Sequence, residues 1–177
     1  MPMVRNPSSL PSAASNSAIK WGAWALVHPR VIEEQTMVIG AADLNIDLVE
    51  KAEEALFKWL IASFLMGKRI RSDVAAQAYR IIVEKHHRDT PDKLAACTHG
   101  QLVRMLGEGR YTRYDESTAN RLLKLSERLT RDYGGKVLNI LEASKDRSEF
   151  EARLKEFEGI GPKTVEIFMR DAQQVLY

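Results

Sequence analysis

The chain has 177 residues, which is enough to bury a hydrophobic core and corresponds to one domain of ordinary size. Its single cysteine, Cys97, excludes an internal disulfide and any zinc site or iron–sulfur cluster that needs several thiolates. The formal net charge of +2 permits a nucleic-acid partner but does not by itself indicate one.

The N-terminal part is predicted to lie outside the helical domain. Residues 1–17 contain three prolines, five serines and few large apolar groups, so we expect a disordered tail. Residues 18–47 carry Trp21 and Trp24 without clear periodicity, and we interpret them as an arm that packs on the domain. The sequence has no secretory signal pattern and no apolar run of the roughly 18 residues that a membrane span needs. We therefore expect a cytoplasmic protein without a membrane partner.

Apolar residues recur at helical spacing from Leu48 onward, with Leu56 and Phe64 on one stripe of the first predicted helix. Capping residues mark further starts, among them Thr98 with Gln101 three residues later. The predicted helices begin near residues 48, 72, 91, 98, 119, 137, 148 and 162. No segment has the alternation of a strand. The prediction is an all-α domain over residues 48–177.

The sequence FEGIGPKTVEIF, residues 157–168, predicts a hairpin of two helices within residues 149–176. Glycine permits a tight reversal and lets a phosphate approach the backbone closely, and amides at the start of the second helix would point at that phosphate. The predicted contacts to a DNA backbone are Gly159, Ile160, Gly161, Pro162, Lys163 and Thr164. The alternative is that the glycines end one helix and the proline starts the next, as in many helical hairpins.

Residues 154–168 resemble the helix-hairpin-helix of the endonuclease III family of DNA glycosylases, and FKWLIASFLM, DTPDKLAACTHGQLVRML and GRYTRYDESTANRLLKLSERL are similar to its upstream helices. The resemblance implies a helical bundle with the hairpin at its C-terminal end, and duplex DNA with a damaged, mismatched or missing base as the partner. It implies base-excision repair, in which Lys163 attacks as a neutral amine and leaves a Schiff base that permits strand cleavage. No iron–sulfur cluster is expected; the cofactor left open is a monovalent cation at the hairpin.

One departure concerns catalysis. The family also uses an aspartate beyond the last hairpin helix, but only fourteen residues follow Lys163. Asp171 is the nearest candidate for this role, and its alternative is a solvated carboxylate on the helix surface. The second hypothesis is therefore a non-catalytic helix-hairpin-helix module that recognises damaged or bent DNA. A third is a protein partner, unknown in kind, that docks on the tryptophan-bearing arm.

Two basic loops complete the predicted DNA interface. Their predicted contact residues are Lys68, Arg69, Arg71, Arg110, Tyr111 and Arg113. The first loop follows the core helix, where the family places a glutamine that fills the gap left by an extruded base, and either of its first two cations could do so. The alternative is a solvated basic loop. The second loop mixes cations with aromatic rings that can stack on a strand, or whose tyrosines simply cap the core.

Overall fold

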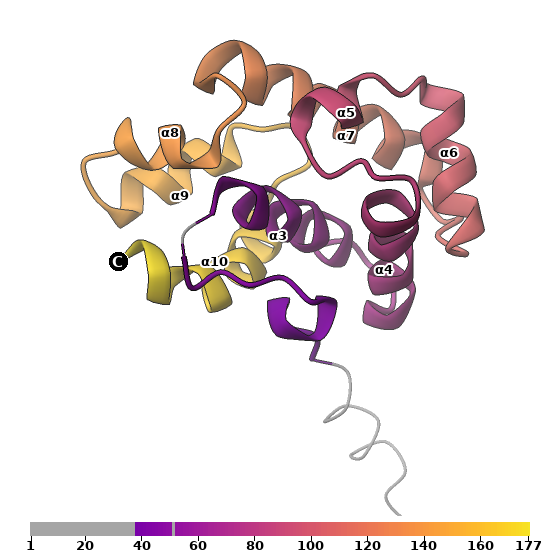
Figure 1. Ribbon diagram of the computed structural model, residues 1–177, viewed down its shortest axis with the longest axis horizontal. Coiled ribbons are helices and arrows are strands. Elements are labelled where there is room, and N and C mark those ends of the chain that lie inside the picture. Colours follow the sequence, from indigo (N-terminus) through magenta and orange to yellow (C-terminus); the bar gives the residue numbers. More distant parts are fainter. Residues whose placement is uncertain (1–37, 51) are drawn as a thin grey trace, which may run out of the picture. The chain divides into compact units, whose positions relative to one another are not determined.

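The computed structural model describes residues 38–50 and 52–177, and its helices are shown in Figure 1. The elements are η1 (Ala41–Leu44), α3 (Glu53–Met66), α4 (Ser72–Tyr79), η2 (Arg80–Lys85), α5 (Pro91–Ala95), α6 (His99–Glu108), α7 (Asp115–Tyr133), α8 (Val137–Glu142), α9 (Arg147–Lys155) and α10 (Pro162–Leu176). These ranges contain no strand, so the all-α fold class is confirmed. The predicted tail and the two tryptophans of the predicted arm lie outside the described residues.

Helix α3 runs through the middle of the domain, where α4, α8 and α10 all pack against it (Figure 1). From Leu56 to Met66 every side chain except that of Lys58 is buried. The single apolar stripe predicted for this helix is therefore too narrow, because a helix that is covered on all sides is apolar all round. The buried indole N–H of Trp59 donates to the carbonyl oxygen of Phe168 at 3.0 Å, which fixes α10 along α3.

The compact unit begins at Ile39, before the predicted boundary at residue 48. Ala41 and Leu44 are buried in this segment, and α3 itself starts only at Glu53. The segment is tied to α10 by two hydrogen bonds. The Asp171 carboxylate accepts from the Ala41 N–H at 2.7 Å, and the Arg170 guanidinium donates to the Ile39 carbonyl at 2.8 Å.

Capping residues decide where several helices start. The box predicted at the start of α6 is confirmed, since Thr98 Oγ1 accepts from the Gln101 N–H at 3.1 Å and Gln101 Oε1 accepts from the Thr98 N–H at 2.9 Å. For the helix predicted to begin near residue 148, Ser148 with Glu151 three residues later also has the spacing of a capping box, but Ser148 is not the cap. Asp146 caps α9 instead and accepts from the Glu149 N–H at 2.9 Å, because an aspartate with a glutamate three residues later offers the same spacing.

Within the described ranges, none of the helices combines the length and the apolar composition that crossing a membrane requires.

Glu53 links the first turn of α3 to the start of α8. Its carboxylate accepts hydrogen bonds from the backbone N–H groups of Val137 and Leu138, the latter at 3.0 Å. Burial raises the pKa of Glu53 above its usual range, although both amides favour the ionised form. The side chain thus satisfies amides that the short helix α8 cannot pair within itself.

We expect Glu53→Ala to lower the free energy of unfolding by about 1–3 kcal/mol, because two partly buried amides lose their acceptor. Urea denaturation measures the change. The matched control is Glu54→Ala, since Glu54 pairs with Lys58 on the surface and its loss should change stability by no more than about 0.5 kcal/mol. Equal effects of the two substitutions would contradict the role of Glu53.

Candidate nucleic-acid interface

The turn between α9 and α10 requires a glycine at position 159. Gly159 has φ +91°, a conformation that L side chains rarely adopt. A Cβ there would also lie 2.9 Å from Cε2 of Phe64 in α3 and 2.9 Å from Cδ of Arg121 in α7. Ile160, the next residue, is buried and anchors the turn inward. The fold alone therefore explains why residue 159 is a glycine.

Gly161 is different, because nothing within the described residues requires a glycine there. Its φ is −106°, and a Cβ at this position would have no atom of a non-neighbouring residue within 4 Å. Gly161 is the N-cap of α10, Pro162 follows at the first helical position, and no side chain caps the helix. Pro162 has no N–H, so the amides left without an intrahelical partner in the first turn include those of Lys163 and Thr164, and no side chain of the described residues caps them. Among the described residues, the turn thus has neither a neighbour packed over Gly161 nor a side-chain cap.

The end of α3 lies directly against the start of α10. Thr164 is buried, and a Cβ added to Gly67 would overlap the Thr164 side chain. This close approach places the loop at residues 67–69 beside the hairpin, as the predicted interface needs. It also turns the Thr164 hydroxyl inward, so that only the backbone of Thr164 remains available for the predicted contact.

Lys68 reaches from this loop to the hairpin. Its Nζ donates to the carbonyl oxygen of Gly159 at 2.5 Å and lies 4.6 Å from the centroid of the Phe64 ring. Burial lowers the pKa of the Lys68 ammonium, and the nearby cation Arg121 lowers it further. Lys68 is therefore held in place and half-buried, unlike the solvated loop residue that was one reading of the sequence.

One face of α7 holds the hairpin from the other side. Arg128 donates to the carbonyl oxygen of Glu156 at 2.5 Å and pairs with its carboxylate at 3.1 Å. Lys124 pairs with Glu158 at 2.9 Å, and Arg121 lies 3.7 Å from the same carboxylate. The three cations follow one another at helical spacing, so they share a face of α7. The acidic residues of the turn are thus directed toward α7.

Two adjoining hollows meet at the hairpin, and together we call them the hairpin cleft. One, of about 420 Å³, is lined by Gly67, Lys68 and residues 159–164. The other, of about 440 Å³, is lined by Gly67, Lys68, Arg69, Tyr114, Ser117, Thr118 and Arg121. The described residues that line the cleft include four cations and no carboxylate. Each hollow has the size of a small-molecule site, which spans about 300–1,000 Å³.

Lys163, the predicted nucleophile, lines the cleft on its outer side. Its side chain is 64% exposed, and Nζ lies 3.3 Å from Oε1 of Glu166, one turn further along α10. Asp171, the candidate carboxylate partner, is used elsewhere. It accepts the Ala41 N–H of η1, so we assign it a structural role and leave it out of the candidate catalytic residues.

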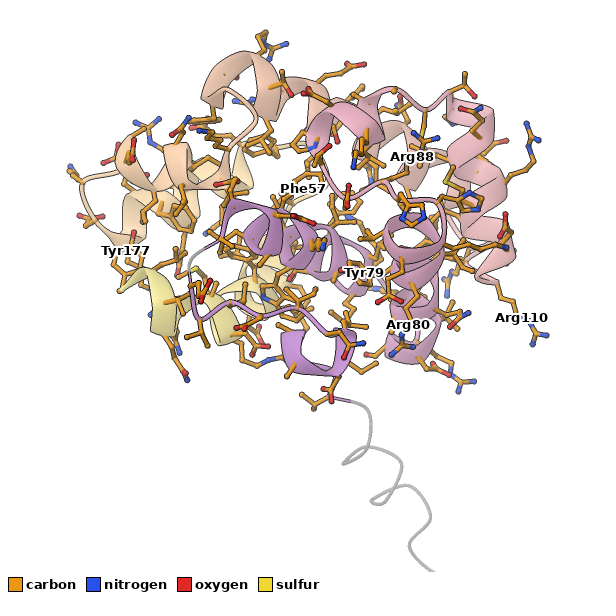
Figure 2. All side chains as sticks on the ribbon, viewed as in Figure 1. Phe57, Tyr79, Arg80, Arg88, Arg110 and Tyr177 are labelled. Atoms are coloured by element: carbon orange, nitrogen blue, oxygen red, sulfur yellow. The ribbon has the colours of Figure 1, made fainter. Side chains whose placement is uncertain are left out.

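Of the remaining predicted cations, some line the cleft and others lie away from it. Arg69 lines it. Arg71 pairs with Asp73 at 2.9 Å and lies outside the residues that line the cleft. Arg110 projects away from the domain after the end of α6 (Figure 2). Arg113 is exposed, with its guanidinium carbon 5.0 Å from the centroid of the Tyr114 ring.

Tyr111 is part of the core, so its predicted stacking on DNA is wrong. The side chain is fully buried, and its O–H donates to the carbonyl oxygen of Leu65 at 3.4 Å. Burial raises the pKa of Tyr111 to about 12. The alternative reading, a tyrosine that caps the core, describes it correctly. The exposed aromatic ring of this loop belongs to Tyr114, which is 50% exposed and lines the cleft.

The sequence analysis placed Tyr114 in a loop of cations and aromatic rings without naming it as a contact residue, and it missed Ser117 and Arg121 as cleft residues. They lie at the start of α7 with the spacing of one helix face, next to the buried Thr118. Had the helix been predicted to start at Asp115 and not near Ala119, this spacing would have signalled a shared polar face beside the basic loop.

Comparison of the chain with protein-family models, with curated proteins and with solved structures found no match. Within the described ranges, no group of three or more His, Cys, Asp or Glu side chains is placed to hold a metal ion. The monovalent cation at the hairpin stays a prediction, and the Gly159 carbonyl that such a cation could use accepts a hydrogen bond from Lys68.

We expect Gly159→Ala to lower the free energy of unfolding by about 2–4 kcal/mol, because the new side chain combines a strained φ with overlap onto Phe64. Gly161→Ala is the matched control. Its Cβ enters open space, so only the N-cap preference is lost and the change should stay below about 1 kcal/mol. Thermal or urea unfolding compares the two variants, and a Gly159→Ala protein as stable as Gly161→Ala would contradict this account of the turn.

Proposed function

We propose that the chain is a base-excision DNA repair protein of the helix-hairpin-helix glycosylase type, which binds duplex DNA containing a damaged, mismatched or missing base. The observation that carries the proposal is the uncapped start of α10 behind Gly161, which opens onto a cleft lined by cations and, among its described residues, by no carboxylate. The sequence resemblance to the endonuclease III family supports the same conclusion.

Phosphate is the ligand that such a site favours. Free amides at a helix start carry partial positive charge and point along the axis toward an anion. Lys163 stands at this end of α10, while Lys68 and Arg69 line the cleft beside it. Contacts of this kind fix a DNA backbone in position without reading its sequence. The choice of lesion would then fall to the pocket that receives the extruded nucleotide.

The cleft also offers a place for chemistry on an extruded nucleotide. A weakened base pair lowers the free energy needed to turn the base out of the stack. The resemblance assigns the nucleophile to Lys163. Its neutral amine would attack C1′ of the sugar, the base would leave with the bonding electron pair, and the resulting Schiff base would permit elimination of the 3′ phosphate.

A second candidate function is a non-catalytic module that recognises damaged or bent DNA. It is favoured by the lining of the cleft, because no carboxylate among the described residues is available there as a general base. The position of Asp171, bound to η1, agrees with this alternative. Both candidates predict the same backbone contacts and differ only in the covalent step.

We expect Gly161→Ala to weaken binding to duplex DNA about tenfold, equivalent to about 1.4 kcal/mol, because the added methyl group stands where the phosphate must approach. Fluorescence anisotropy with a labelled duplex, titrated at several salt concentrations, measures the affinity. Lys163→Ala should also weaken binding and reduce the slope of log affinity against log salt by about 1.

The matched control for this experiment is Gly100→Ala. Gly100 is an exposed glycine near the start of α6 with equally open space around its Cα. The substitution should therefore leave DNA affinity unchanged. If Gly161→Ala bound DNA as tightly as Gly100→Ala, the start of α10 would not be a phosphate site.

We expect the wild-type protein to form a covalent adduct with abasic duplex DNA in the presence of borohydride, which reduces a Schiff base to a stable amine. Lys163→Ala should form this adduct about 1.5- to 2-fold more slowly, because it lacks the nucleophile that the resemblance assigns. Denaturing gel electrophoresis follows the adduct. Salt-sensitive binding by the wild-type protein without any adduct would favour the non-catalytic candidate.

A further inference from the structure

Lys68 occupies the junction of the two hollows that form the hairpin cleft. Apart from Gly67, it is the residue that lines both of them. One hollow borders the free backbone of the hairpin, and the other borders Tyr114 and the start of α7. A nucleotide that enters from a backbone held at the hairpin would therefore meet the Lys68 side chain on either route.

The Lys68 amine is also better positioned than that of Lys163. Its Nζ is fixed by the Gly159 carbonyl at 2.5 Å, and its side chain lies over the Phe64 ring. Lys163 is 64% exposed, and the partner of its amine is the equally exposed Glu166. A reacting group that is already held in one place loses less entropy when it reacts than a freely moving one does.

The charges around Lys68 favour its neutral form. Burial lowers the pKa of the Lys68 ammonium, and the positive charge of Arg121 lowers it further. Glu158, which lies 3.7 Å from Arg121, is bound to Lys124 at 2.9 Å. The Gly159 carbonyl and the Phe64 ring act in the opposite direction, but the net direction is downward. A neutral amine can still donate one N–H to Gly159 while its lone pair stays free to attack.

We propose that Lys68 is a second amine nucleophile of the hairpin cleft, which forms a Schiff base with the aldehyde of an abasic site. The inference rests on the proposed function, because it requires that the cleft receives damaged DNA. It adds Lys68, in the loop after α3, to Lys163 of α10, the catalytic residue that the resemblance assigns.

The reaction balances without a further cofactor. The amine lone pair attacks C1′ of the ring-opened sugar, and the carbinolamine loses water to give a protonated imine. A water molecule then accepts the C2′ proton, and the C2′–H bonding electrons form a C2′–C3′ double bond as the 3′ phosphate leaves with the electrons of its bond to C3′, which cleaves the strand. Water hydrolyses the imine and regenerates the Lys68 amine. Borohydride intercepts the imine by delivering hydride to C1′, which leaves the sugar on Nζ.

The experiment identifies the lysine that carries the sugar. The full-length wild-type protein is trapped with borohydride on a duplex with one abasic site, digested, and mapped by mass spectrometry. The variants Lys68→Arg, Lys163→Arg and the double substitution are treated alike, since arginine keeps the charge and the hydrogen-bond donors but is not a nucleophile. Lys145→Arg, in the loop before α9 and away from the cleft, is the control and should trap at the wild-type rate.

We expect adducts on Lys68 in the wild-type protein and in Lys163→Arg, a severalfold lower yield in Lys68→Arg, and no adduct in the double variant. An adduct on Lys163 alone, with Lys68→Arg trapping at the wild-type rate, would overturn the inference and leave the proposed function intact. Salt-sensitive binding without any adduct would overturn both this inference and the lyase activity. Even if Lys68→Arg folds poorly, mapping of the wild-type protein shows whether Lys68 carries the sugar.

Discussion

The packing of the end of α3 against the hairpin determines where every other part of the cleft lies. Phe64 lies beneath Gly159, and Gly67 lies against Thr164, so the two segments approach more closely than any side chain at either glycine would allow. This contact brings Lys68 within reach of the Gly159 carbonyl. It also aligns the start of α10 with the start of α7, whose residues complete the cleft. A shift of α3 would therefore separate the backbone site from the pocket beside it.

The packing around the hairpin also determines which charged residues lie near each other. Glu156 and Glu158 belong to the turn, yet they are bound by Arg128 and Lys124 of α7. Their negative charge is thereby partly neutralised, and it does not line the cleft. The hairpin turn thus carries two acidic residues that pair with α7 and are not among the described residues that line the cleft.

The sequence was sufficient for features that depend on local signals. The Thr98 cap and the Gly-Ile-Gly turn follow from neighbouring residues, and the structure has the helices there. Features that depend on distant partners were not accessible. Asp171 binds Ala41, and Lys68 binds Gly159, across most of the chain. Leu48 is buried but lies in the loop before α3 and not in a helix, although its spacing suits either.

In the loop at residues 110–114 the sequence also did not predict which side chains are buried. Arg110 and Tyr114 both have positive φ, at 62° and 63°, and this reverses the chain so that Tyr111 points into the core and Tyr114 out of it. Neither residue is of the type that usually signals such a conformation. Composition therefore identified a loop rich in cations and aromatic rings, but not which tyrosine faces the solvent.

The attachment of α10 has a consequence for local unfolding. A helix at the end of a compact unit usually frays, and its amides exchange with solvent through small openings. Here Arg170 and Asp171 bind the segment at residues 39–41, and Trp59 binds the carbonyl oxygen of Phe168. The middle of α10 can open only if that segment detaches and α3 loses its partner. Its amides should therefore exchange as one cooperative unit with the core, so that the hairpin keeps its shape unless the core itself opens.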